Sequence, residues 1–183
     1  MANPALLIID IQNDYFPDGS MPLHAPVAAA EQAARVLERF RQRDWPRFHI
    51  QHESIRPGAG FMIPGTEGQA IHPLLTPESD EPVVIKHFPS AFQETSLGDQ
   101  LQAQAVDELV VCGMMTHMCI DTSVRAAFER GYTVQLIADA TATRSLQFGP
   151  DEVSADQVQS AFLAALHGTF AQVLSTQAWL QQT

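Results

Sequence analysis

The sequence predicts an α/β protein of three layers, with helices on both faces of a six-stranded, mainly parallel sheet. Apolar runs of strand length alternate along the chain with stretches that repeat apolar residues every three to four positions, which is the spacing of a helix face. Runs such as LLII and LVVC show no polar alternation, as is typical of strands that are buried on both faces.

Six segments have the length and composition of strands. The first is uniformly apolar and stops at Asp10, the third leads into Lys86, and the fifth ends before Asp139. A stretch rich in Gly and Pro separates the second from the third, and loops of that length are often functional. The expected strands are residues 5–9, 47–51, 83–85, 108–112, 133–138 and 170–174, and the long loop is 56–82.

Five segments have helical signals. Apolar residues from Ala30 to Phe40 repeat at the spacing of one face. Ser154 and Gln157 match a capping box, and Gly131 stands where a left-handed residue closes a helix. The expected helices are residues 27–40, 97–105, 118–130, 154–167 and 175–180.

Composition limits the class of protein. The 183 residues suit one domain, residues 1–183, and 45% apolar with 17% charged residues is an ordinary globular balance. A net charge of −11 disfavours nucleic acid or an anionic membrane as partner, and the basic residues form no cluster that would grip phosphates. We therefore expect a small-molecule partner.

The sequence also limits where we expect the protein to be located. No apolar run approaches the roughly 20 residues that cross a bilayer. The amino-terminal segment lacks the basic region and cleavage site of a secretory signal. Cys112 and Cys119 form neither a disulfide framework nor a C-x-x-C motif, so we expect a reducing, cytoplasmic location.

Ligands of open α/β sheets bind beyond the carboxyl ends of the strands, which restricts the candidate site residues. A carboxylate, an amine and a thiol are then predicted to converge. The residues that leave those ends are Asp10, His52, Glu53, Lys86, the segment 113–119 and Asp139.

Cys119 is the candidate nucleophile. It lies near the start of a predicted helix, where free amides and the helix dipole favour a thiolate and lower a cysteine pKa. The alternative is that Cys119 is a small buried hydrophobe, which is the reading we prefer for Cys112 inside the apolar strand. Asp10 is a candidate base, a cap or a solvated strand end, and Lys86 is a candidate partner of the thiolate or of Asp10. The turn from Gly113 could present amides to an oxyanion, or be an ordinary connection.

Three blocks, LLIIDIQNDYF, VIKHFPSAF and VVCGMMTHMCIDTSVRAAFERGY, resemble the signature blocks of isochorismatase-like cysteine hydrolases. They occur in family order, and the match runs from residue 5 to about 176. The resemblance implies a catalytic triad of Asp10, Lys86 and Cys119. It also implies a cis peptide at Met114–Met115, an oxyanion hole from the amides of Met115 and Cys119, sheet order 3-2-1-4-5-6, and a homo-oligomer of two or more copies.

One departure from the family concerns metal. Nicotinamidases of this family carry an Asp-x-His pair after the second strand, whereas this chain has His52 and Ser54 there. A metal site needs several well-placed ligands, and His49, His52 and His72 are the remaining alternative. We therefore predict no metal and no other cofactor.

The resemblance favours hydrolysis of a C–N bond in a small amide, ureide or carbamoyl compound, through a thioester on Cys119. The alternatives are a vinyl-ether hydrolase acting on isochorismate and a non-catalytic binding or assembly module. Isochorismate carries two carboxylates, and Arg144 and Arg56 are the evident basic candidates, although Arg144 could equally be a solvated loop residue. The residues expected to bind substrate are Phe16, Phe61, His72, Phe92, Met115 and Arg144.

Overall fold

The computed structural model describes residues 2–183 and contains a six-stranded sheet in the order β3-β2-β1-β4-β5-β8. All five strand pairings are parallel. The predicted α/β class and the order 3-2-1-4-5-6 are confirmed, since β8 is the sixth strand of this sheet. The strands are β1 (Pro4–Ile9), β2 (Arg47–His52), β3 (Val83–Lys86), β4 (Glu108–Met114), β5 (Thr133–Ala142) and β8 (Gln172–Leu174).

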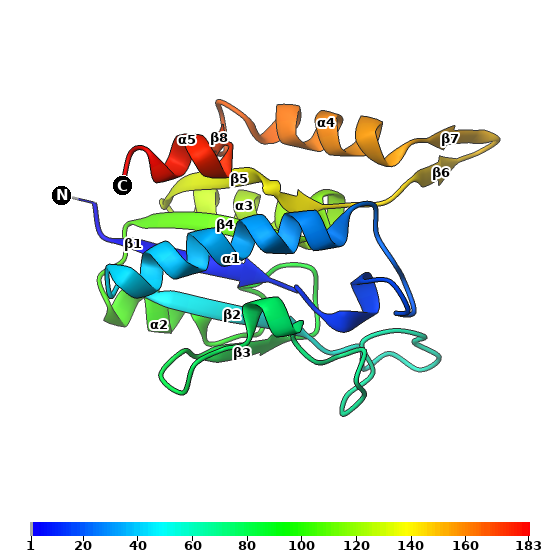
Figure 1. Cartoon of the computed structure of the whole chain (residues 1–183), viewed down its shortest axis with the longest axis horizontal. Helices are drawn as coiled ribbons and strands as arrows, with labels where there is room; N and C mark the ends of the chain where they lie inside the picture. The colour runs from blue at the N-terminus through cyan, green and yellow to red at the C-terminus, as the bar shows by residue number, and fades with distance from the viewer. Residues whose placement is uncertain (1) are drawn as a thin grey trace.

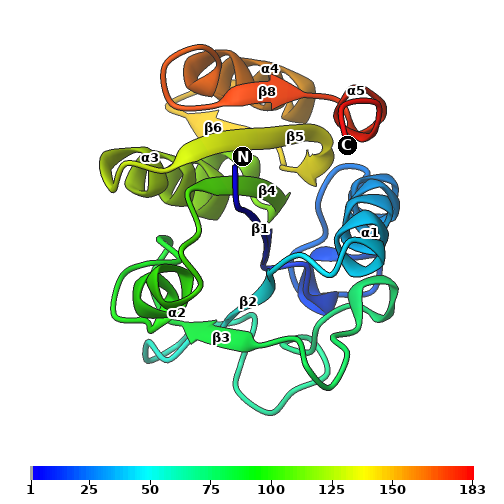
Figure 2. The same cartoon turned by 90° about the vertical axis from the view of Figure 1, so that its left-hand side faces the viewer.

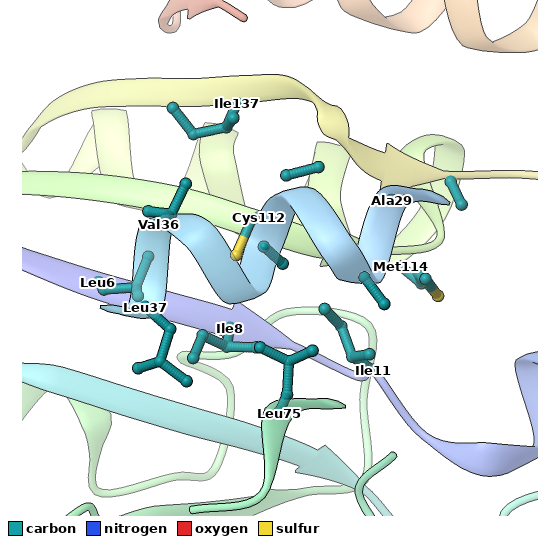
Figure 3. Close-up of a cluster of buried hydrophobic side chains, with 14 of the residues drawn as sticks. Leu6, Ile8, Ile11, Ala29, Val36, Leu37, Leu75, Cys112, Met114 and Ile137 are labelled. Atoms are coloured by element: carbon teal, nitrogen blue, oxygen red, sulfur yellow. The ribbon is translucent and has the colours of Figure 1, made fainter. Parts of the chain in front are cut away.

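Helices cover both faces of the sheet (Figure 2). The centrally placed β1 is buried along its whole length, and its residues alternate between two cores. Leu6 and Ile8 face the core beneath α1 and α5, which Figure 3 shows in part, whereas Leu7 and Ile9 face the core beneath α2 and α3. The helices are α1 (Pro26–Gln42), α2 (Leu97–Ala103), α3 (Asp121–Glu129), α4 (Ala155–Leu166) and α5 (Thr176–Leu180).

The structure differs from the sequence prediction after β4. Residues 118–130 were expected to form one helix, but a π-helical turn, Thr116–Ile120, precedes α3. β5 continues to Ala142, so Asp139 lies inside the strand, where its Oδ1 accepts hydrogen bonds from the amide and hydroxyl of Thr176. Asp139 therefore anchors the start of α5 and does not leave a strand end.

A hairpin of two short strands, β6 (Leu146–Phe148) and β7 (Asp151–Val153), was not predicted. It extends beyond the body of the molecule between β5 and α4 (Figure 1). Strands of three residues with mostly exposed side chains show neither an apolar run nor an alternation of polar and apolar residues, so the sequence does not predict them. Within the described residues, no helix is long and apolar enough to cross a membrane.

Candidate active site

Asp10, Lys86 and Cys119 meet at the carboxyl edge of the sheet. Asp10 directly follows β1, Lys86 ends β3, and Cys119 lies in the π-helical turn after β4. Lys86 Nζ is 2.7 Å from Asp10 Oδ2 and 3.3 Å from Cys119 Sγ. Asp10 and Lys86 are fully buried and Cys119 is 6% exposed. The structure thus brings together the three residues proposed as a triad.

Lys86 reaches this position although β2 separates its strand from β1. Side chains of β3 alternate between outside and inside, so that Val83 and Ile85 are exposed while Val84 and Lys86 point inward. The ammonium group also donates to the Phe88 carbonyl at 3.1 Å. The stem therefore lies in the core and only the charged end contacts polar groups.

Backbone conformations at the ends of β1 and β4 shape the site. Asp10 has φ of 51° and Gly113 has φ of 131°. A Cβ on Gly113 would lie 2.0 Å from the carbonyl oxygen of Ile9, so glycine lets β4 approach β1 closely at this point. The Met114–Met115 peptide is cis, as the family resemblance implies. The assignment of the Met115 and Cys119 amides to an oxyanion hole stays a prediction.

Burial controls the charge states in the site. Burial lowers the pKa of Lys86, but the nearby Asp10 and Cys119 raise it more, so the pKa is raised overall and the amine is charged. Burial and the negative charge of Asp10 together raise the pKa of Cys119, and Lys86 only partly offsets them. The raised pKa is opposite in direction to our expectation of a thiolate favoured by a helix start, and it favours the thiol form in the resting site.

Asp10 is placed to act on that thiol. Its Oδ2 faces the Lys86 ammonium, while its Oδ1 is buried and lacks a hydrogen-bond partner among residues 2–183. An unpartnered buried carboxylate oxygen next to a protonated thiol is a ready proton acceptor.

A cavity of about 440 Å³ opens onto Cys119. Two of the predicted substrate-binding residues, Phe61 and Met115, line it, and the lining is largely apolar. One guanidinium, that of Arg56, lines it. The other lining residues are Tyr15, His52, Ser54, Ile55, Pro57, Gly58, Ala59, His87, Pro89 and Met118.

Four residues expected to bind substrate lie elsewhere. Phe16 and His72 stack on each other with centroids 3.7 Å apart, and neither lines the cavity. Phe92 packs under Arg130, whose guanidinium carbon is 4.6 Å from the ring centroid. Arg144 is exposed in the segment between β5 and β6. The aromatic residues near strand ends were predicted to bind substrate from their closeness to the triad in sequence, and sequence position does not show where a side chain points.

Sequence reasoning missed Tyr15 and His87, and it gave His52 no definite role. His87 directly follows Lys86, and the rule that strand ends carry site residues could have found it. Tyr15 lies in a 3₁₀ turn, Asn13–Tyr15, and only folding back of that turn brings it to the cavity. Burial raises the pKa of Tyr15 well above its usual value, so it is a neutral hydroxyl there.

The polar residues after Asp10 hold the long segment between β2 and β3. Gln12 Nε2 donates to the carbonyls of His52 and Gln69, at 2.9 and 2.7 Å. Asn13 donates to the carbonyl of Glu67 at 2.9 Å. Asp14 accepts from the amide of Ser20 at 3.0 Å and from that of Met62. These bonds fix one wall of the cavity relative to the triad.

The histidines considered as metal ligands do not gather. His49 bonds Glu81 at 2.9 Å, His52 lies 3.3 Å from Lys86 Nζ, and His72 stacks on Phe16. In the part of the chain that the structure describes, no group of three His, Cys, Asp or Glu side chains is placed to hold a metal ion.

Comparisons with known proteins point to one family. Residues 4–178 match the family model of the isochorismatase domain. YddQ, an uncharacterized isochorismatase family protein of Bacillus subtilis strain 168, is 50% identical over 177 residues, covering 97% of this chain and 98% of its own. A solved structure of an isochorismatase-family protein from Oleispira antarctica has a TM-score of 0.94 at 42% identity, covering 98% and 96% of the two chains.

A relative with a named activity is the maleamate amidohydrolase of Pseudomonas putida strain KT2440. It is 33% identical over 159 residues, which cover 77% of this chain and 73% of its own. The match of the family model to nearly the whole chain, and the extent of these likenesses, show that the chain belongs to the isochorismatase family of hydrolases.

Proposed function

We propose that this protein is a cysteine hydrolase that cleaves the C–N bond of a small amide, ureide or carbamoyl compound. The observation that carries the proposal is the contact of one ammonium group with both a carboxylate and a thiol. Lys86 Nζ lies 2.7 Å from Asp10 and 3.3 Å from Cys119, at the base of a cavity. This arrangement supplies a base, a nucleophile and a fixed positive charge.

In the first step Asp10 takes the proton of the Cys119 thiol. The raised pKa of Cys119 makes a base necessary, and the Lys86 charge stabilises the thiolate that forms. The sulfur then attacks the carbonyl carbon, and the electron pair of the C=O bond moves to oxygen. The amides of Met115 and Cys119 are the proposed donors to this oxyanion.

In the second step the C–N bond breaks and Asp10 returns its proton to the leaving nitrogen. The products are ammonia or an amine and a thioester on Cys119. Water then attacks the thioester, with Asp10 as base, and releases the acid and the thiol. Protons balance over the cycle, and no other reactant is required.

The cavity supports a small substrate. A volume of about 440 Å³ with aromatic and aliphatic walls suits a compact molecule with few polar groups. One guanidinium at the wall is poorly matched to the two carboxylates of isochorismate. The likeness to a maleamate amidohydrolase independently supports amide chemistry, since that relative is named for it.

The test is a screen of small amides, ureides and carbamoyl compounds for ammonia release, with an isochorismate assay for pyruvate in parallel. We expect Cys119→Ala to abolish turnover of any active amide, because no other group can form the thioester. Cys112→Ala is the matched control, since Cys112 is fully buried in β4 and its loss leaves the chemistry intact. Full activity of Cys119→Ala would end the proposal, pyruvate without ammonia would favour the vinyl-ether reaction, and no turnover in either assay would favour a binding module.

A further inference from the structure

Lys86 is surrounded by more hydrogen-bond acceptors than its ammonium group can satisfy. Its Nζ lies 2.7 Å from Asp10 Oδ2 and 3.1 Å from the Phe88 carbonyl oxygen. Cys119 Sγ and His52 Nδ1 are each 3.3 Å away. A lysine ammonium has three N–H donors. Four acceptors therefore share three protons, and one acceptor lacks a full hydrogen bond.

The distances indicate which acceptors compete. The two oxygens are nearest, and the Asp10 carboxylate forms an ion pair with the ammonium, so they are the preferred acceptors of two N–H donors. This preference leaves the third donor between the sulfur of Cys119 and the ring nitrogen of His52. Because an ammonium group only donates, His52 Nδ1 must be unprotonated to serve as its acceptor. The ring proton of a neutral His52 is then on Nε2.

We propose that His52 is a positioning residue that competes with Cys119 for the third N–H of Lys86. In the resting site this N–H is directed to His52 Nδ1, and it turns to Cys119 Sγ when the thiolate forms. No covalent bond changes in this step, since only the direction of donation is altered. The inference rests on the proposed function, in which the Cys119 thiolate is the nucleophile. As a consequence, the Lys86 ammonium donates its third N–H to the Cys119 sulfur only after Asp10 has accepted the thiol proton.

The charge state of His52 suits an acceptor. Burial and then the charge of Lys86 lower the pKa of His52 to about 4. Asp10 acts in the opposite direction, while His87 and Arg56 add to the lowering. The ring is therefore neutral at pH 7 and keeps a free electron pair.

The position of His52 is fixed from two sides. The side chain of Gln12 accepts from the His52 amide at 2.8 Å and donates to the His52 carbonyl at 2.9 Å. Phe61 lies nearly parallel to the ring, with centroids 6.3 Å apart and an interplanar angle of 15°. Gln12 thus holds the backbone of His52, and the ring lies beside Phe61 with Nδ1 at 3.3 Å from Lys86 Nζ.

The alkylation rate of Cys119 by iodoacetamide at pH 8 tests the proposal on the full chain. Peptide mapping by mass spectrometry separates Cys119 from Cys112. In His52→Leu the third N–H has only sulfur as acceptor, so the thiolate is favoured and we expect alkylation roughly tenfold faster, equivalent to about one unit of thiol pKa. A purely space-filling role predicts the opposite sign, because leucine in place of a polar ring raises the thiol pKa further.

His52→Asn is the matched variant, since its amide oxygen can take the place of Nδ1 as acceptor. We expect it to react at nearly the wild-type rate, although asparagine is smaller and would leave sulfur more accessible. His24→Leu removes an exposed histidine that contacts Asp156 at 3.5 Å, and its rate should equal that of wild type. Unchanged or slower alkylation in His52→Leu, or equal acceleration in His52→Asn, would overturn the proposal.

A second measurement uses the wild-type protein and does not depend on the folding of any variant. Long-range ¹H–¹⁵N spectra report the tautomer of His52, and we expect the proton on Nε2. A proton on Nδ1 would overturn the proposal, because that nitrogen could not then accept from an ammonium group. Neither measurement needs a substrate. A failed amide screen therefore counts against the proposed function alone, and failure here alongside Cys119-dependent turnover removes only the role of His52.

Discussion

The two cysteines of this protein differ in their charged neighbours, not in their burial. Cys119 and Cys112 are both buried thiols with raised pKa values, yet only Cys119 has a carboxylate and an ammonium group beside it. Lys86 stays charged in the core because Asp10 balances the cost of removing its ammonium from water. Each member of the pair is therefore tolerated only in the presence of the other.

Removal of one partner of this pair should destabilise the fold. In Lys86→Met the buried carboxylate of Asp10 loses its counter-ion, and we expect a loss of about 3 kcal/mol in the free energy of unfolding. The double variant Asp10→Asn with Lys86→Met removes both charges and should recover much of that loss. Urea denaturation measures both. Equal losses in the single and double variants would show that the pair does not couple as described.

Among the elements, the contact between β1 and β4 sets the geometry of the site. Asp10 follows one strand and Gly113 belongs to the other, and the pairing register places Ile9 opposite Gly113. The close approach of these backbones leaves no room for a side chain on β4 at this point. The turn that carries Cys119 begins three residues later.

Gly113→Ala should destabilise the protein by more than about 3 kcal/mol, because the new Cβ meets Ile9 at 2.0 Å and φ is 131°. Gly98→Ala is the control, since Gly98 lies in α2 with nothing within 4 Å of an added Cβ. We expect that change to stabilise by about 0.5–1 kcal/mol. Thermal unfolding compares the two, and a neutral Gly113→Ala would refute the close-approach argument.

At the amino-terminal end of β2 and β3, Glu81 joins three elements. Its carboxylate accepts from Arg41 at the end of α1 at 2.7 and 2.8 Å, and from Arg47 on β2 at 2.7 Å. His49 adds a contact at 2.9 Å. The Glu81 side chain is fully buried, so these bonds close the end of the long segment before β3.

This cluster should make stability depend on pH. Burial raises the pKa of Glu81, but the hydrogen bonds from Arg41 and its neighbours lower it far more, to well below the usual 4.5. A depressed folded-state pKa adds stability that is complete above pH 4.5 and declines as the pH falls below that value. We therefore expect the free energy of unfolding of Glu81→Gln to be about 2 kcal/mol below that of wild type at pH 7. The difference should shrink progressively below pH 4.5, and urea titrations measure it. A difference from wild type that is constant between pH 7 and pH 3 would contradict this.

For the whole molecule, the short and mostly exposed hairpin β6–β7 is the feature that points to contact with another chain. It extends from the body (Figure 1), and Phe148 near its tip is 83% exposed. A two-stranded hairpin is only marginally stable by itself in water, and exposed apolar side chains are typical of contact surfaces.

We propose that the chain forms a homo-oligomer to which this hairpin contributes. Phe148→Ser should shift the protein toward the monomer in light scattering, whereas the change Gln147→Ala on the same hairpin should have little effect. A wild-type mass near 20.1 kDa would contradict the proposal.

The sequence predicted the strands that carry the site, the sheet order through the family resemblance, and the candidates Asp10, Lys86 and Cys119. These depend on local apolar periodicity and on short motifs, which neighbouring residues determine. Sequence reasoning did not find the walls of the cavity, because Tyr15 and Phe92 follow strand ends in similar ways and point to different places.

What the sequence by itself determined was the six strands of the main sheet, the approximate positions of the five α-helices and the identity of the reactive groups. The tertiary structure decided their distances and charge states. Lys86 contacts Asp10 and Cys119 only because β3, β1 and β4 align in one parallel sheet. The pKa of Cys119 is raised because residues distant in sequence exclude water from the thiol and place a carboxylate beside it. The burial of a side chain and its distance from residues far away in sequence are properties of the packed chain, and no local sequence pattern encodes them.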